Sequence, residues 1–313
     1  MPQKRVLILG HGAMGRMFEQ LLGPHYPLSI WDRNPDTGEE TAPLESVAPG
    51  HDLALLAVPT SPHEELAERL AACLSSGALC LSIAKGLDAA GNSPAEILAR
   101  HFHARDNVHW GVIYGPMIAR DLSEGRSGFA LAAARKMASA NTMVSWFQPT
   151  ALYLQADDDP IGAAWAAILK NVYVPLIGMA DGLHLGDNMR GFLLCEALAE
   201  LARILAYKGG RASTAYGLAG LGDLMTTATS LHSHHRGIGE ALAKGDRSDI
   251  AADDGNLRSE GVNTARRVRE HGLLDLNGFP LFRIAADCID APEAMSTELN
   301  RFLTDRFPGY ETK

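Results

Sequence analysis

Short apolar runs alternate with helix-like patterns throughout the first half of the chain. The apolar runs lie at residues 6–9, 28–31, 53–58, 78–84, 108–114, 129–133 and 151–155. Most of them are continuous rather than alternating with polar residues, which is typical of strands that helices cover on both faces. The pattern therefore predicts an α/β domain with a doubly wound, mostly parallel sheet.

The pattern changes after Asp159. From there on, segments rich in Ala and Leu repeat with helical periodicity at 161–180, 190–207, 223–243, 262–272 and 281–304. We therefore expect two domains, 1–159 and 160–313, of which the second is all-α. Residues 245–259 are polar and rich in Asp, Gly and Ser, and we expect them to form a mobile loop.

One helical segment, 160–180, is apolar enough to be mistaken for a membrane span. Lys170 and Asn171 lie in its middle, and polar groups are costly at that depth in lipid. We therefore expect a buried helix and no membrane insertion. Residues 1–5 lead directly into an apolar run and a glycine turn, without the cleavable apolar region of a secretory signal.

Charge and cysteine content narrow the function classes. The 313 residues include 37 acidic and 28 basic ones, which gives a formal net charge of −9. A polyanion needs a basic surface, so we expect no nucleic acid among the partners. Cys73, Cys80, Cys195 and Cys288 are too far apart for a metal cage or a disulfide framework. We expect a cytoplasmic protein that binds a small-molecule substrate, and the sequence leaves open whether it is a monomer or a homodimer.

A glycine motif follows directly on the first predicted strand. Gly10, Gly12 and Gly15 form G-x-G-x-x-G and open a segment with apolar residues at helical spacing. In this context the first glycine permits the turn and the second lets a pyrophosphate approach the backbone. The third lets the helix pack against the strand. We expect a Rossmann-type domain that binds a dinucleotide here, the alternative being a purely structural glycine turn.

Asp32 and Arg33, at the end of the second predicted strand, bear on the choice of cofactor. A carboxylate at this place binds the ribose 2′-hydroxyl of NAD, whereas an arginine accommodates the 2′-phosphate of NADP. We expect NAD or NADP with a slight preference for NAD, because the carboxylate repels a phosphate while the long arginine can turn away. A solvated turn is the alternative for both residues.

Two lysines stand out by their surroundings. Lys85 directly follows the fourth predicted strand, where ligands bind in such folds; the alternative is a solvated loop lysine. Lys170 lies within the apolar helix beside Asn171. Burial disfavours the charged form of an amine, which suits a group that gives and takes a proton near neutrality. Pro175 cannot donate to the Asn171 carbonyl, so we expect a kink there. A structural lysine whose head group reaches solvent is the alternative.

Two motifs in the second half are rich in glycine and histidine. Residues 217–224 read Gly-Leu-Ala-Gly-Leu-Gly-Asp-Leu and lead into a helix whose N-cap we expect to be Asp223. Three of the 12 histidines are His232, His234 and His235, next to Arg236. No carboxylate or cysteine adjoins them, so we expect no metal site and instead an anion contact that depends on pH.

In this order, these motifs resemble the NAD(P)-dependent glycerol-3-phosphate dehydrogenase family over most of the chain. The residues that carry the resemblance are 10–15, 58–60, 85–87, 115–119, 169–171, 180–188, 217–224 and 260–262. The resemblance implies reduction of dihydroxyacetone phosphate to sn-glycerol 3-phosphate, a precursor in phospholipid synthesis. It also implies an N-terminal Rossmann-type domain followed by a helical domain.

The resemblance further implies roles for individual residues. Lys170 is the expected catalytic acid and base, and Lys85 and Asp223 complete the catalytic set. Further substrate contacts are expected from Gly115, Met117, Asn171, Thr227, His234, His235 and Arg236. Cofactor contacts are expected from Gly10, His11, Gly12, Ala13, Met14, Gly15, Asp32, Arg33, Pro59, Lys85, Ala119 and Glu260.

The chain departs from the family pattern most clearly at the expected phosphate site. The family has an Arg-Asn pair that binds the substrate phosphate and the cofactor, and His234 and His235 occupy those positions here. Two alternatives therefore stay open. One is a related reductase that acts on a different small polar carbonyl compound, and the other is a cofactor-binding pseudoenzyme or redox sensor.

Overall fold

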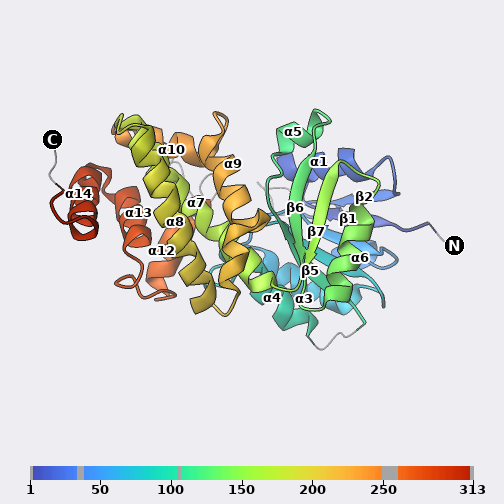
Figure 1. Cartoon of the computed structure of the whole chain (residues 1–313). Helices are drawn as coiled ribbons and strands as arrows, with labels where there is room; N and C mark the ends of the chain where they lie inside the picture. The colour runs from blue at the N-terminus through green and yellow to red at the C-terminus, as the bar shows by residue number, and fades with distance from the viewer. Residues whose placement is uncertain (1–2, 34–38, 104–106, 249–259, 311–313) are drawn as a thin grey trace. The chain divides into compact units, whose positions relative to one another are not determined.

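A computed structural model describes residues 3–33, 39–103, 107–248 and 260–310. The chain divides into two compact units, Met1–Trp165 and Ala166–Lys313 (Figure 1). The predicted loop 245–259 lies mostly outside the described residues.

The first unit contains a seven-stranded sheet of order β2-β1-β3-β4-β5-β6-β7. All neighbouring strands run parallel except β5 and β6, which are antiparallel. The strands are β1 Val6–Leu9, β2 Leu28–Trp31, β3 Leu53–Leu56, β4 Leu79–Ser82, β5 His109–Tyr114, β6 Gly128–Ala133 and β7 Leu152–Asp157. Each predicted apolar run overlaps one of them, so the α/β, mostly parallel sheet is confirmed.

Helices connect and cover these strands. They are α1 Ala13–Leu22, α2 Leu44–Val47, α3 His63–Cys73, α4 Pro94–Phe102, α5 Ala119–Ser123 and α6 Met137–Phe147. Residues of α1, α5 and α6 share one hydrophobic core with the sheet, in which Phe18 meets Phe147 edge to face. Every residue of β1, β3 and β4 is buried, which explains why these strands are apolar on both faces.

The second unit is helical, as predicted. Its helices are α7 Pro160–Gly182 (of which the first residues belong to the first unit), α8 Asp187–Tyr207, α9 Asp223–Thr229, α10 His234–Ala243, α12 Glu260–Glu270, α13 Pro280–Asp290 and α14 Met295–Arg306. Two segments that were predicted as continuous helices are interrupted in the structure. The segment 223–243 breaks before Ser233, whose side chain caps α10, and the segment 281–304 breaks at Pro292.

Helix α7 is the most buried element of the second unit. It has the length and composition of a membrane span, yet 94% of its most apolar 18-residue stretch is buried within the protein. Glycines bring neighbouring helices onto it: a Cβ on Gly239 would lie 2.0 Å from the Pro175 carbonyl oxygen, and one on Gly261 would lie 2.0 Å from the Asn171 carbonyl oxygen. Pro175 cannot donate to that Asn171 carbonyl, and the helix nevertheless runs on to Gly182.

Candidate active site

The glycine turn between β1 and α1 has the shape of a dinucleotide-binding turn. Gly10 has φ +96°, and a Cβ there would lie 2.5 Å from Val58. A Cβ on Gly15 would lie 2.0 Å from the Gly10 carbonyl oxygen, whereas one on Gly12 would meet nothing within 4 Å. Gly10 and Gly15 are therefore required by the fold itself. Gly12, at the start of α1, leaves open space for a pyrophosphate.

Asp32 lies beside this turn, at the end of β2. Its carboxylate accepts hydrogen bonds from the backbone N–H groups of His11 and Arg33, each at 2.8 Å. The predicted acidic residue is thus placed against the glycine turn, where a cofactor's adenosine ribose binds in folds of this type. His11 Nε2 contacts Glu19 Oε2 at 2.6 Å, so this imidazole is held on α1.

Arg33 belongs to a cluster of arginines and carboxylates. Its guanidinium reaches Glu65 at 2.7 Å and Glu40 at 3.2 Å. Arg69 contacts the same two carboxylates and Glu45. The hydrogen bonds from Arg69 lower the pKa of Glu40 to about 2. Arg33 is therefore already paired with two carboxylates beside the predicted adenosine site.

The other predicted residues of the first unit lie in loops after strands or at the start of a helix. Pro59 follows β3, Lys85 follows β4, and Ala119 begins α5. Gly115 follows β5 with φ +158°, and a Cβ on it would lie 2.5 Å from the Phe129 carbonyl oxygen. Met117 is buried in the hydrophobic core, so a substrate contact there would use its backbone.

In the second unit, helix α7 brings Lys170 to two side chains of α9. Its Nζ donates to Thr227 Oγ1 at 2.6 Å and lies 3.2 Å from Asp223 Oδ1. Thr227 in turn donates its hydroxyl hydrogen to the Asp223 carbonyl oxygen at 2.7 Å. The ion pair is almost fully buried, with 6% and 5% of the two side chains exposed. Such a buried, fixed amine can act as a proton donor and acceptor.

The expectation that Asp223 is an N-cap was wrong. A π-helical turn, Leu218–Gly222, runs directly into α9, and Asp223 already has helical backbone angles. Asp223 is therefore the first residue of α9 rather than its cap, and its carboxylate pairs with Lys170. The glycines before it permit close packing, because a Cβ on Gly220 would lie 2.1 Å from the Ala215 carbonyl oxygen.

Asn171 and Glu260 lie on two helices that touch. Asn171 follows Lys170 on α7 and is 1% exposed. Glu260 is the first residue of α12, and the next residue, Gly261, packs on the Asn171 carbonyl. The segment 260–262 thus packs against the part of α7 that carries Lys170.

His234 and His235 are the first two residues of α10, and their rings are 6.0 Å apart. The N-cap Ser233 accepts from the Arg236 N–H, so the backbone N–H groups of the two histidines are in the first turn, where a helix attracts anions. Arg236 is turned to Asp181, at 3.0 Å, and to Glu240, at 2.8 Å. Asp181 also binds Arg190 at 2.6 Å. Asp181 lies in one of the motifs but was not among the predicted site residues.

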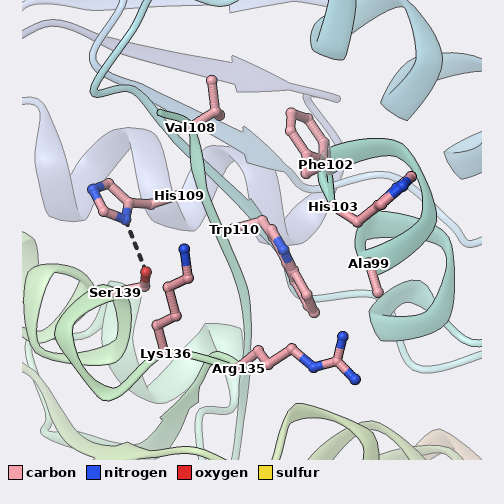
Figure 2. A pocket seen from close by; sticks show the side chains of 9 residues that line it. All are labelled: Ala99, Phe102, His103, Val108, His109, Trp110, Arg135, Lys136 and Ser139. Carbon is pink, nitrogen blue, oxygen red and sulfur yellow. Dashed lines mark hydrogen bonds between the residues drawn. The ribbon is translucent and has the colours of Figure 1, made fainter. Parts of the chain in front are cut away.

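Two other features do not belong to this set. A pocket of about 220 Å³ lies at the start of β5. Its lining includes Trp110, Arg135 and Lys136 (Figure 2) and none of the predicted site residues. Within the described part of the chain, no group of three or more His, Cys, Asp or Glu residues is arranged to hold a metal ion.

Family models and curated relatives match most of the chain. Models for the N-terminus and the C-terminus of NAD-dependent glycerol-3-phosphate dehydrogenase match residues 33–140 and 159–297. A glycerol-3-phosphate dehydrogenase [NAD(P)+] from Synechococcus elongatus is 31% identical over 303 residues, 96% of each chain. One from Moorella thermoacetica is 30% identical, covering 87% of this chain and 88% of its own.

Solved structures of that name share the fold. The glycerol-3-phosphate dehydrogenase of Coxiella burnetii superimposes with a TM-score of 0.80 at 23% identity, covering 96% of this chain and 99% of its own. The fold, the two matching family models and the full-length relatives agree with one another. The chain belongs to the NAD-dependent glycerol-3-phosphate dehydrogenase family and is an NAD(P)-dependent oxidoreductase.

Proposed function

We propose that this chain reduces dihydroxyacetone phosphate to sn-glycerol 3-phosphate, a precursor for phospholipid synthesis. The observation that carries the proposal is the buried Lys170–Thr227–Asp223 cluster, since it supplies the proton that reduction of a ketone requires. When bound, the dihydronicotinamide supplies the hydride for the carbonyl carbon. The glycine turn and Asp32 of the first unit are the residues that would hold the dinucleotide.

The proposed proton transfer follows from the hydrogen bonds of Lys170. As the carbonyl carbon is reduced, negative charge develops on its oxygen, and the Lys170 ammonium donates a proton to that oxygen. Thr227 and Asp223 fix the amine and balance its charge before the transfer. Lys85 is a second cation proposed to bind the oxygen or the neighbouring hydroxyl group of the substrate.

His234 and His235 are proposed to bind the substrate phosphate at the start of α10. Two observations support this. The first turn of the helix carries the backbone N–H groups of both residues, and such a turn attracts anions. Arg236, which could otherwise bind the phosphate in their place, is already bound to Asp181 and Glu240. An imidazole cannot offer two parallel donors to one phosphate, whereas an arginine binds phosphate with two parallel hydrogen bonds.

We therefore expect His234→Arg to lower the KM for dihydroxyacetone phosphate several-fold at pH 7.5. Steady-state kinetics check this expectation, with His271→Arg, on an exposed histidine directly after α12, as the matched control. A KM that His234→Arg leaves unchanged would place the phosphate elsewhere.

NAD is the proposed physiological cofactor. A 2′-phosphate beside Asp32 would meet a carboxylate, and Arg33 is already bound to Glu65 and Glu40. Accommodating a phosphate would require Arg33 to leave these two partly exposed ion pairs, which opposes its accommodation modestly.

NADH should accordingly have a lower KM than NADPH. Asp32→Asn should narrow the difference by about tenfold because it removes one charge, roughly 1.4 kcal/mol of discrimination, yet keeps an oxygen for the His11 N–H. Arg33→Ala should leave the ratio unchanged. A wild-type preference for NADPH that Arg33→Ala abolishes would contradict the assignment.

The test of the reaction is a panel of carbonyl compounds assayed with NADH and with NADPH by absorbance. The panel should include dihydroxyacetone phosphate, glyceraldehyde 3-phosphate and several 2-oxo acids. We expect dihydroxyacetone phosphate to have the highest kcat/KM. Preferred reduction of an unphosphorylated compound would favour a related reductase, and cofactor binding without any turnover would favour a pseudoenzyme.

A further inference from the structure

Three buried or half-buried histidines of the first unit bind a serine hydroxyl, and one of these pairs adjoins the predicted site. His51 binds Ser29 at 2.9 Å, His109 binds Ser139 at 2.8 Å, and His63 binds Ser82 at 2.8 Å. His63 and Ser82 are both 0% exposed. Ser82 ends β4 and lies three residues before Lys85, so this pair is placed where it can affect the loop that carries the lysine.

The hydrogen bonds of His63 run in one direction. Nδ1 lies 2.8 Å from the Pro59 carbonyl oxygen, which can only accept, so Nδ1 carries the proton. Burial lowers the pKa of His63 to about 4, so the ring is neutral and Nε2 is an acceptor. Ser82 therefore donates its hydroxyl hydrogen to Nε2 and uses its oxygen to accept from the Ala84 N–H, at 3.2 Å.

Ala84, the residue before Lys85, is thus held by hydrogen bonds to both its N–H and its carbonyl group. The Ala84 N–H is bound by Ser82, and the Ala84 carbonyl accepts from the Tyr114 hydroxyl at 2.6 Å. After the lysine, the buried Asp88 accepts from the N–H groups of Ala90 and Asn92 and closes the loop. Pro59, in the loop after β3, and Ala84, the residue before Lys85 in the loop after β4, are therefore linked through His63 and Ser82 by one buried chain of hydrogen bonds.

We propose that His63 is a positioning residue, which sets the backbone of Lys85 relative to the Pro59 turn through Ser82. The inference rests on the proposed function in one respect, namely that Lys85 binds the substrate. His63 itself touches neither substrate nor cofactor in this account. Its contribution is geometric, because small displacements of a substrate-binding group lower turnover strongly.

A pair of substitutions separates this role from general stability. His63→Asn places an amide near the Nδ1 position, so it keeps the bond to Pro59 and loses Ser82. His63→Gln places an amide near the Nε2 position, so it keeps Ser82 and loses Pro59. Each variant loses one buried hydrogen bond, and we expect similar losses of stability. We expect kcat/KM for dihydroxyacetone phosphate to fall about tenfold or more in His63→Asn and less than threefold in His63→Gln.

Two controls make the result specific. In a Lys85→Ala background, His63→Asn should change kcat/KM by less than twofold, because the group that it positions is absent. His51→Asn removes the matched His–Ser bond just before β3, at the other end of the strand from Pro59, and should lower stability without changing the kinetics.

Hydrogen exchange at the amides of residues 83–87 gives a readout that does not depend on the substrate. Protection should be lost in His63→Asn and kept in His63→Gln. Equal kinetics and equal protection in the two variants would overturn the positioning role. So would a full effect of His63→Asn in the Lys85→Ala background. If instead the exchange pattern is as expected and dihydroxyacetone phosphate is not reduced, the positioning stands and the proposed reaction fails.

Discussion

Substitution of Lys170 with alanine is expected to lower kcat by about 100- to 10,000-fold, the range of a positioned general acid. Binding of NADH should be nearly unchanged, because the glycine turn and Asp32 belong to the first unit whereas Lys170 belongs to the second. Stopped-assay or absorbance kinetics measure the first quantity, and titration of NADH fluorescence measures the second. Retention of more than a tenth of the wild-type kcat would rule out the acid–base role.

The same substitution leaves the buried Asp223 without its cation, which costs about 3–5 kcal/mol in stability. Lys170→Met combined with Asp223→Asn removes both charges and should retain the fold while losing activity to the same extent. Lys244→Ala, on an exposed lysine at the end of α10, is the matched control and should have wild-type kinetics.

The second large effect is expected at Glu200, a residue that sequence analysis did not single out. This carboxylate is 2% exposed and accepts hydrogen bonds from the Tyr173 hydroxyl and from the N–H groups of Leu281 and Phe282. It thereby joins α8 to α7 and to the start of α13. Glu200→Ala leaves these donors without an acceptor, and we expect the free energy of unfolding of the helical unit to fall by about 3 kcal/mol.

Urea denaturation followed by circular dichroism measures this loss. Glu196→Ala is the matched control one turn earlier on α8, where a partly exposed carboxylate pairs with Arg306, and it should cost less than about 1 kcal/mol.

Burial raises the pKa of Glu200. Its folded pKa therefore exceeds its unfolded one, so the wild type should lose stability relative to Glu200→Gln as the pH rises through the raised value. Equal stability of Glu200→Ala and Glu196→Ala would contradict the account.

The sheet was predictable from the sequence because strands buried on both faces consist of continuous runs of apolar residues. Every residue of β1, β3 and β4 is buried, and all of these residues except Ser82 are apolar. The ends of the apolar runs therefore come within two residues of the strand ends. The glycine turn was predictable for a similar reason. Gly10 and Gly15 lie where any side chain would collide with the backbone.

The partners of polar side chains were not predictable, because they depend on contacts between distant segments. Asp223 looked like a helix cap, since the local sequence does not show that Lys170 lies 3.2 Å away. Arg33 was predicted as a residue that could bind a phosphate, because the local sequence does not show that Glu65 of α3 pairs with it. His63 gave no signal, because its role depends on Ser82 of the neighbouring strand.

The most direct test of the proposed function compares dihydroxyacetone phosphate with dihydroxyacetone, using NADH and the wild-type chain. The two compounds share the carbonyl group and differ only in the phosphate. We predict that kcat/KM for the phosphorylated compound is at least about 100-fold higher, equivalent to roughly 2.7 kcal/mol of transition-state binding, and that the product is sn-glycerol 3-phosphate. Equal values for the two compounds, or no oxidation of NADH with either, would contradict the account.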